Sequence, residues 1–296
     1  MRLRYDIVDV FTDRPFAGNQ LAVVHGAEGL ATEQLQALAQ EFAYSETTFP
    51  SAGRQTSYDV RIFTPERELP FAGHPTLGTA WVLRSQGSLS AEEVTQVCGA
   101  GRIGVRFAED RVELSAEPRE QVGPVPPDLA ADLLASLGLT GEDLAGDAWV
   151  AGCGLSFVHV PVTEGAVGRA VGTGASFAEH AERLAALGPL AESLDAVNLY
   201  AVSGSAPRVD VHSRVFVPGA GVAEDPATGS AAAGLGIALV VRGVLPDGGA
   251  YAISQGTEMG RPSRLFGRVE AEAGRAVRCF VAGHVQPVAT GEIAVP

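Results

Sequence analysis

Two copies of one short pattern carry the residues best suited to chemistry in this 296-residue sequence. His74-Pro-Thr-Leu-Gly-Thr-Ala80 returns 151 positions later as Asp225-Pro-Ala-Thr-Gly-Ser-Ala231, so both copies read [His/Asp]-Pro-x-x-Gly-[Ser/Thr]-Ala. Each copy begins with a titratable side chain, and an imidazole or a carboxylate there could polarise a substrate carbonyl, amine or ring. Helix capping would by itself explain Asp225, but histidine is a poor cap, so capping does not explain His74.

Glu46 is the candidate for a proton-transferring base. Moving a proton from one carbon to another needs one movable base shielded from water, and a carboxylate serves if burial raises its pKa toward the working pH. Glu46 follows an apolar helical pattern and precedes Thr-Thr-Phe, so we expect it at a strand end, pointing into a cleft. The alternative is a solvated or helix-capping glutamate, which is the more common role of a lone glutamate in a polar turn.

Both copies of the pattern predict the start of a helix. Proline fits the first helical position, where its missing N–H costs nothing, and Asp225 is placed to cap the helix. The N-terminus of a helix carries partial positive charge and free N–H groups, which attract a carboxylate or a phosphate. Two such helix starts facing each other across a cleft would form a pocket for a small anion.

The elements that must hold these residues recur in the two halves of the chain. Matching strands, Arg61-Ile-Phe-Thr-Pro65 and Arg214-Val-Phe-Val-Pro218, precede the two motifs, and we expect both arginines to be solvated or paired. Hydrophobic periodicity predicts helices at 32–43, 75–86, 128–137, 177–187 and 226–242. Alternating residues predict strands at 4–10, 20–24, 58–64, 94–97, 102–107, 111–116, 149–151, 156–162, 196–202, 209–217, 250–255, 264–272 and 275–281.

A proline-rich stretch at 118–127 predicts the boundary between two related domains. We expect an N-terminal half at 1–120, completed by 284–296, and a C-terminal half at 121–283, with the active site in the cleft between them. Mostly antiparallel strands with one long helix in each half indicate an α+β fold.

The composition argues against several classes of protein. The net charge of −14 at pH 7 disfavours nucleic acid or an anionic membrane surface as a partner. Three cysteines without C-x-x-C fit a reducing compartment, and the N-terminus enters a strand directly, so we expect a cytoplasmic protein without a signal peptide. No G-x-x-x-x-G-K-[ST] is present, no G-x-G-x-x-G turn joins a predicted strand to a predicted helix, and the six histidines are dispersed, so NAD, ATP and metal ions are not expected.

With these residues in view, the chain resembles the PhzF family, named for phenazine biosynthesis, and more distantly the diaminopimelate epimerase fold. The matching segments follow the family's order over nearly the whole chain: YDIVDVFTDRPFAGNQLAVV, SETTF, RIFTPERELPFAGHPTLGTA, EDPATGSAAAGL and QGTEMGRPSRL. The resemblance implies two pseudo-symmetric domains, each a mostly antiparallel, barrel-like sheet around a central helix. It also implies a cofactor-independent isomerase of a small anionic substrate, commonly a homodimer.

The resemblance also implies roles for individual residues. The family's best-known reaction isomerises trans-2,3-dihydro-3-hydroxyanthranilate, with a glutamate moving the proton and a His, an Asp and a Ser assisting. Carried over by motif position, these residues are Glu46, His74, Asp225 and Ser230. The expected substrate-binding residues are Gly73, Thr76, Gly229, Gln255 and Gly256. Arg261, in the turn after Gly256, would offer a cation to a carboxylate, unless that turn only joins two strands.

Two other functions remain open. An epimerase or racemase needs an acid on each face of one carbon, often paired cysteines, but Cys98, Cys153 and Cys279 lie outside both motifs. We expect these cysteines to be small core residues. A catalytically silent binding protein has no need of a buried base, which counts against that function. Exchange of solvent hydrogen into a ligand separates enzyme from binder, and inversion at one carbon separates a racemase from a proton shift.

Overall fold

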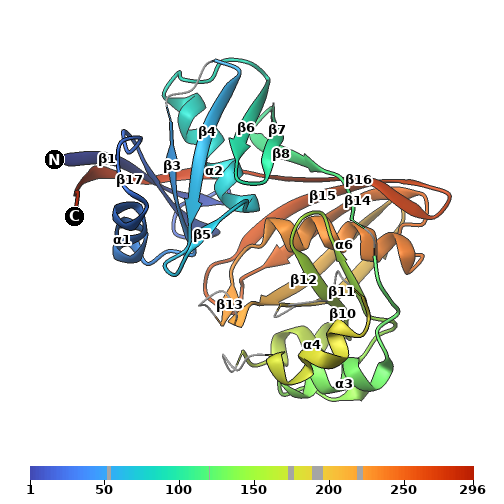
Figure 1. Ribbon diagram of the computed structural model, residues 1–296. Coiled ribbons are helices and arrows are strands. Elements are labelled where there is room, and N and C mark those ends of the chain that lie inside the picture. The colour runs from blue at the N-terminus through green and yellow to red at the C-terminus, as the bar shows by residue number, and fades with distance from the viewer. Residues whose placement is uncertain (52–54, 120, 173–176, 189–195, 219–222) are drawn as a thin grey trace. The chain divides into compact units, whose positions relative to one another are not determined.

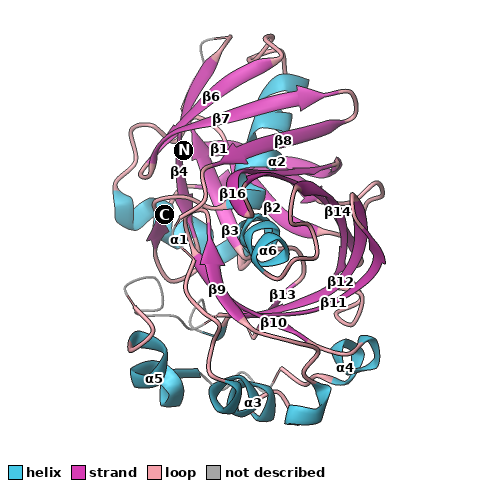
Figure 2. Cartoon of the chain, turned by 90° about the vertical axis from the view of Figure 1, so that its right-hand side faces the viewer, coloured by secondary structure: helices cyan, strands magenta, loops and turns pink. Residues whose placement is uncertain are grey.

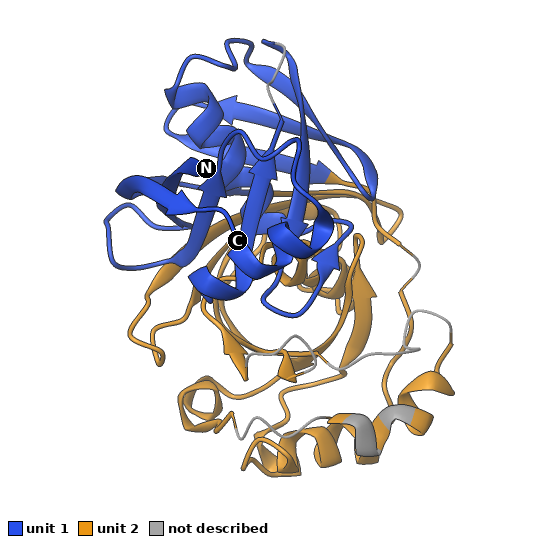
Figure 3. Ribbon diagram, turned by 60° about the vertical axis from the view of Figure 1, so that its left-hand side comes forward, with its two compact units in different colours: residues 1–115, 282–296 blue, residues 116–281 orange. Residues whose placement is uncertain are grey.

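The computed structural model describes residues 1–51, 55–119, 121–172, 177–188, 196–218 and 223–296 (Figure 1). The chain divides into two compact units (Figure 3). Unit 1 comprises Met1–Ser115 and Ala282–Pro296, and unit 2 comprises Ala116–Val281. In the predicted linker, Glu120 lies outside the described residues. Within the described ranges, no helix is both long and apolar enough to cross a membrane.

Unit 1 is a mixed sheet with two helices. Its strands are β1 (Arg2–Val10), β2 (Asn19–Val24), β3 (Glu46–Pro50), β4 (Ser57–Phe63), β5 (Glu68–Leu69), β6 (Glu93–Cys98), β7 (Gly101–Ala108), β8 (Arg111–Ala116) and β17 (Val285–Ala294). Its helices are α1 (Thr32–Phe42) and α2 (Gly73–Ser85). The last strand, β17, pairs antiparallel with the first, β1, so the end of the chain belongs to unit 1. Parallel pairing of β2 with β3 places Leu21 opposite Glu46, and α2 packs on β1, β2 and β3.

Unit 2 repeats this plan with an additional group of short helices. Its strands are β9 (Trp149–Gly152), β10 (Ser156–Pro161), β11 (Val197–Ser205), β12 (Arg208–Phe216), β13 (Glu224–Asp225), β14 (Gly248–Gln255), β15 (Ser263–Glu272) and β16 (Arg275–Gly283). Its helical segments are α3 (Pro127–Ala135), η1 (Gly141–Asp143), α4 (Glu164–Arg169), η2 (Phe177–His180), α5 (Ala181–Ala185) and α6 (Gly229–Val241). The helix predicted at 177–187 is therefore a short 3₁₀ segment followed by little more than one helical turn.

Helix α6 lies in the interior of the curved sheet of unit 2, where it contacts β9, β10 and β15 (Figure 2). Its sequence, GSAAAGLGIALVV, contains no charged residue, and a helix that is apolar on all sides is stable only when it is buried all round. The prediction of a sheet around a central helix is confirmed for this unit. Most strand pairs among the described residues of both units are antiparallel, but the sheet is not closed, so the expected barrel is only partial.

The predicted helix starts are wrong in both copies of the repeated motif. Helix α2 begins at Gly73, so Pro75 is its third residue, and α6 begins at Gly229, beyond Pro226. The N-cap residue of α6 is Thr228, and Asp225 lies in β13, paired with Val215 of β12. Pairing of β13 with β12 therefore holds the backbone at Asp225 extended, and α6 starts only after this pairing ends.

The glycine of the first motif copy, Gly78, serves packing between helix and sheet. A methyl group on its Cα would lie 2.5 Å from Leu21 Cδ2 and 2.9 Å from Val10 Cγ2. The motif therefore needs glycine here because α2 lies directly against β1 and β2.

Gly78→Ala is expected to lower the free energy of unfolding by about 1–3 kcal/mol, because the added methyl overpacks a closed core. Urea unfolding followed by circular dichroism measures this difference. Gly29→Ala is the control, since nothing lies within 4 Å of the methyl group it adds. Equal stability of the two variants would contradict the packing role of Gly78.

Candidate active site

The Glu46 and His74 side chains meet in unit 1. Glu46 is the first residue of β3 and His74 the second residue of α2, so the packing of that helix on β3 brings them together. Glu46 Oε2 lies 3.4 Å from His74 Nδ1. His74 is 4% exposed, and the Glu46 side chain is 15% exposed. Glu46 lies at a strand end, as expected from the sequence, and its position in a cleft stays a prediction.

His74 is a neutral imidazole with a defined tautomer. Burial lowers the pKa of His74 to about 3, so the ring carries no charge at neutral pH. Its Nε2 lies 3.3 Å from the backbone carbonyl of Gln20, which can only accept, so Nε2 carries the hydrogen. Nδ1 therefore presents a lone pair to Glu46. A carboxyl O–H can donate to such a lone pair, whereas a carboxylate, which only accepts, cannot.

Asn19 and Ser45, which the motifs did not single out, extend this cluster. Asn19 Nδ2 lies 3.4 Å from His74 Nδ1, and Ser45 Oγ donates to Asn19 Oδ1 at 3.3 Å. Their positions in the sequence could have indicated both residues. Asn19 is the first residue of a buried strand that follows a turn, and Ser45 directly precedes Glu46, the candidate base.

The motif threonines of unit 1 are engaged in its core. The hydroxyls of Thr79 and Thr48 share a hydrogen bond of 2.8 Å. Thr76 donates to the carbonyl of Ala72 at 2.8 Å and accepts from Gln96 Nε2 at 2.8 Å. A substrate contact by Thr76 stays a prediction, as does one by Gly73.

Asp225 is the centre of a second polar cluster, in unit 2. Thr228 Oγ1 donates to Asp225 Oδ2 at 2.5 Å, and Gln255 Nε2 donates to the Asp225 carbonyl at 2.8 Å. Gln255 also accepts from the Thr228 backbone N–H through Oε1 at 3.3 Å. The predicted binding residue Gln255 therefore holds the backbone around the predicted catalytic aspartate.

The other predicted residues of unit 2 lie next to this cluster in the chain. Gly256 has φ of 73°, and a methyl group on it would lie 2.6 Å from the Pro226 carbonyl, so glycine is required there. Gly229 and Ser230 open α6, with Gly229 buried and Ser230 half-buried. Arg261 donates its backbone N–H to the Gly256 carbonyl at 3.0 Å. The structure thus groups Glu46 with His74 and, separately, Asp225 with its neighbours.

Arg61 and Arg214 form equivalent ion pairs, so of the two expected alternatives, solvated or paired, the structure shows pairing for both. Arg61 makes two hydrogen bonds to Glu68, and Arg214 makes two to Glu224. Each guanidinium also lies over a phenylalanine two residues later, at 5.1 and 5.0 Å. The pairs differ in burial: the side chains are 38% and 40% exposed in unit 1 but 7% and 12% in unit 2.

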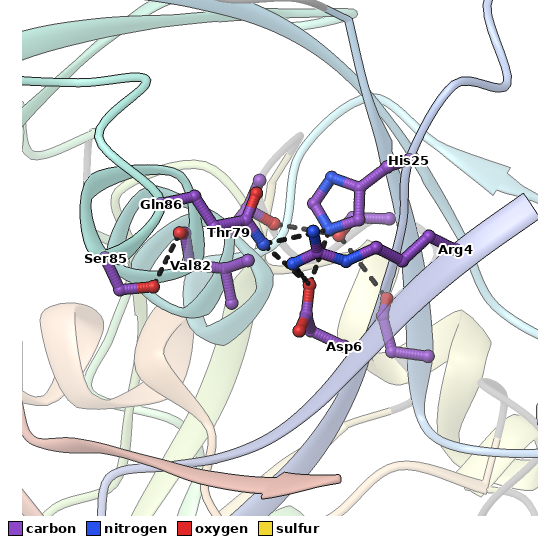
Figure 4. A network of polar contacts seen from close by, with 9 residues as sticks. Arg4, Asp6, His25, Thr79, Val82, Ser85 and Gln86 are labelled. Atoms are coloured by element: carbon purple, nitrogen blue, oxygen red, sulfur yellow. Dashed lines mark hydrogen bonds and ion pairs between the residues drawn. The ribbon is translucent and has the colours of Figure 1, made fainter. Parts of the chain in front are cut away.

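A third polar cluster ties the end of α2 to β1 in unit 1 (Figure 4). Asp6 Oδ2 lies 2.7 Å from His25 Nε2, accepts from Gln86 Nε2 at 2.7 Å, and lies 3.5 Å from an Arg4 nitrogen. Cavities of about 310 and 760 Å³ in this unit are both lined by Trp81, and neither is lined by Glu46 or His74. The Asp6 cluster and the two cavities are therefore separate from the Glu46–His74 pair.

Comparison with known proteins decides the family. The family model for phenazine biosynthesis-like proteins, PhzC-PhzF, matches residues 8–291. The chain belongs to the PhzF family. A trans-2,3-dihydro-3-hydroxyanthranilate isomerase of Pseudomonas aeruginosa is 35% identical, over 97% of this chain and 98% of that protein.

Solved structures show the same fold. A predicted epimerase from Pseudomonas aeruginosa has a TM-score of 0.81 and 30% identity, covering 99% of this chain and 100% of the other. A PhzF-family protein of Bacillus anthracis has a TM-score of 0.82 at 23% identity, with both chains fully covered. The α+β epimerase-like fold and the resemblance drawn from the motifs are confirmed, and the protein is a PhzF-like isomerase.

The cysteines of this PhzF-like isomerase are placed differently from the expectation. Cys279 is buried, but Cys98 and Cys153 are only half-buried, so the prediction of three core residues is wrong for two of them. Both half-buried cysteines lie where a strand ends, which leaves one side of each open to solvent. Among the described residues, no group of three or more His, Cys, Asp or Glu could hold a metal ion.

A second buried histidine of the PhzF fold, His159, is engaged in the core of unit 2. Its Nε2 lies 3.2 Å from the Ala151 carbonyl and its Nδ1 lies 3.0 Å from Asn198 Nδ2. Burial lowers the pKa of His159 to about 4. The folded state therefore holds this ring neutral at pH values where the unfolded chain would protonate it.

His159 is expected to make the protein sensitive to acid. Its pKa is about 4 when folded and 6.5 when unfolded, so the unfolded state binds more protons between these values. Its contribution, about 3 kcal/mol at 1.36 kcal/mol per pH unit, is fully present above pH 6.5 and is lost as pH falls toward 4. Urea unfolding of wild type and His159→Gln from pH 7.5 to 4.5 measures the effect. The variant should show a flatter pH dependence, and parallel curves would contradict the assignment.

Proposed function

We propose that this PhzF-like isomerase moves a proton between two carbons of a small cyclic acid, with Glu46 as general acid and base and without a cofactor. The observation that carries the proposal is the contact of Glu46 with the neutral His74. Burial disfavours the charged form of a carboxyl, which makes the carboxylate a stronger base for taking a proton from carbon.

The proposed reaction needs one group acting twice. The Glu46 carboxylate takes a proton from one carbon, and the electron pair of the broken C–H bond enters the conjugated system of the substrate. The Glu46 O–H then gives the proton to a second carbon, where a C–H bond forms and the carboxylate is restored. Protons and electrons balance within the substrate and Glu46, so the step consumes no co-reactant. His74 holds the proton-bearing carboxyl between the two transfers.

The proposed substrate is trans-2,3-dihydro-3-hydroxyanthranilate or a closely related ring acid. The support is the 35% identical isomerase of that name in Pseudomonas aeruginosa, together with the matching Glu46 and His74 motifs. The test is incubation of this compound with the enzyme in D₂O, with carbon-bound deuterium followed by NMR and mass spectrometry. Product carrying deuterium supports the proposal, whereas unchanged substrate would overturn this choice of substrate.

Asp225 and Ser230 are proposed to assist the same reaction. The support is the repeated motif, in which Asp225 occupies the position of His74 and Ser230 that of Thr79. Gln255 and Gly256 would maintain the local structure around Asp225, as their contacts indicate. Loss of turnover in Asp225→Asn with unchanged thermal stability would support a catalytic role for Asp225. Full activity of this variant would contradict that role.

Epimerisation is the second candidate function, because a solved structure at 30% identity carries the description of a predicted epimerase. The two chemistries give different labelling patterns. An epimerase inverts one carbon and leaves the positions of the double bonds unchanged, whereas a proton shift moves them. Inspection of the D₂O product by NMR separates the two.

We further propose that the enzyme works as a cytoplasmic homodimer. The support is membership of a family whose members commonly form homodimers, together with the cysteine-poor composition. Size-exclusion chromatography with light scattering should give twice the mass of the chain, and cell fractionation should recover the protein with the cytosol. A monomer would contradict the proposed dimer, and recovery from another compartment would contradict the proposed cytoplasmic location.

A further inference from the structure

Asn19 contacts His74 on the ring edge that faces Glu46. Its Nδ2 lies 3.4 Å from His74 Nδ1, the same nitrogen that lies 3.4 Å from Glu46 Oε2. Asn19 is 1% exposed, which places its amide beside the pair and away from water. Asn19 can therefore influence the one ring nitrogen that is available to the candidate base.

The Asn19 amide has a single favourable orientation in this cluster. Ser45 Oγ donates to Asn19 Oδ1 at 3.3 Å, which leaves Nδ2, a donor, facing His74. An amide N–H requires an acceptor, so it favours the tautomer in which Nδ1 keeps its lone pair. The Gln20 carbonyl favours the same tautomer from the other side of the ring, at 3.3 Å from Nε2. Asn19 and Gln20 thus act together on the state of His74.

Unit 2 contains the same order of hydrogen bonds without the carboxyl. Ser213 Oγ donates to Asn198 Oδ1 at 2.5 Å, Asn198 Nδ2 lies 3.0 Å from His159 Nδ1, and His159 Nε2 lies 3.2 Å from a carbonyl. Among the described residues, no carboxylate pairs with His159. An asparagine amide therefore contacts a histidine Nδ1 in each unit, once in a core and once beside a candidate base.

We propose that Asn19 is a positioning residue: by donating to Nδ1 it holds His74 in the Nε2–H tautomer and so keeps a hydrogen off the ring nitrogen that lies 3.4 Å from Glu46 Oε2. Asn19 acts through His74 and is not itself a proton carrier. In Asn19→Ala the ring loses the donor at Nδ1 and can rotate or exchange tautomers. In Asn19→Asp the new carboxylate accepts from Nδ1–H, which selects the opposite tautomer or the imidazolium.

The test reads the tautomer directly by long-range ¹H–¹⁵N NMR of the histidine rings in ligand-free protein, with the His74 signals identified by their loss in His74→Gln. Wild type should show one protonated nitrogen, Nε2. Asn19→Ala should show mixed tautomers, and Asn19→Asp should show a protonated Nδ1. Asn198→Ala is the matched control, because it should change the His159 signals and leave those of His74 in place.

The kinetic arm rests on the proposed function. In the D₂O assay, Asn19→Ala should lower kcat by up to about 100-fold with little change in KM, as expected for a misplaced catalytic group. Asn198→Ala should keep its kcat at temperatures where it is folded.

Two outcomes would overturn the inference. The first is a hydrogen on Nδ1 of His74 in the wild-type protein, and the second is a His74 tautomer in Asn19→Ala that is the same as in wild type. If the NMR results are as expected and wild type turns over no ring acid, the role of Asn19 stands and the proposed substrate fails.

Discussion

Glu46→Gln is expected to reduce the rate of deuterium incorporation by about 10²–10⁴-fold, the usual contribution of a positioned acid–base group. Glutamine keeps the size of the side chain, and its amide N–H can still donate to His74 Nδ1, 3.4 Å from the present Oε2 position. The substitution therefore removes the ability to carry a proton and little else. Initial rates by NMR in D₂O, at saturating substrate, measure the effect.

Two further variants sharpen this result. Glu46→Asp keeps a carboxyl but withdraws it by one methylene, so its rate is expected to lie between those of wild type and the glutamine variant. Glu68→Gln alters an exposed glutamate of the same unit, whose side chain is 40% exposed, and should leave the rate unchanged. Glu46→Gln with wild-type turnover would exclude Glu46 as the proton carrier and would move the search to Asp225.

Glu224→Ala is expected to lower the free energy of unfolding by about 3–5 kcal/mol, the usual cost of leaving a buried charge without its partner. The Arg214 side chain is 7% exposed and donates two hydrogen bonds to the carboxylate oxygens of Glu224. Those hydrogen bonds raise the pKa of Arg214, and an arginine does not neutralise itself when the partner is removed. The variant would keep the Arg214 hydrogen bonds to the carbonyls of Val167 and Ala170, which carry no compensating charge.

The corresponding arginine–glutamate pair of unit 1, Arg61 with Glu68, provides the control for this prediction. Glu68→Ala breaks a pair with the same two hydrogen bonds and the same arginine–phenylalanine contact, but with side chains 38% and 40% exposed. Exposed pairs typically contribute about 0.2–1 kcal/mol, so this variant should unfold close to wild type. Urea unfolding at pH 7 and thermal denaturation measure both. Equal losses in the two variants would show that burial does not set the strength of these pairs.

Much of the candidate site could be predicted from the sequence because the information is local. The repeated motif marks His74 and Asp225 at corresponding places, and periodicity locates α2 and α6 to within a few residues. The uncharged composition of α6 is typical of a buried helix, whereas the sheet around that helix was an expectation from the family resemblance. The PhzF motifs are also local, which is why the family could be assigned without coordinates.

Other features depend on contacts between distant segments. The motif proline and Asp225 suggested helix starts that strand pairing overrides, since β13 extends the backbone at Asp225 and delays α6 to Gly229. Asn19 meets His74 across 55 positions, and only the packing of α2 on β2 brings them together. The two arginine–glutamate pairs have the same local pattern, and their different burial arises from the helix α4, which caps Arg214 through backbone carbonyls.

The sequence by itself therefore determined the residue types of the site, the repeated elements that carry them and the family. The tertiary structure decided which polar groups meet, which tautomer His74 adopts and which ion pair is buried. The physical reason is that propensity, periodicity and capping act over a few neighbouring residues, whereas desolvation and hydrogen-bond partners are set by segments far apart in the chain.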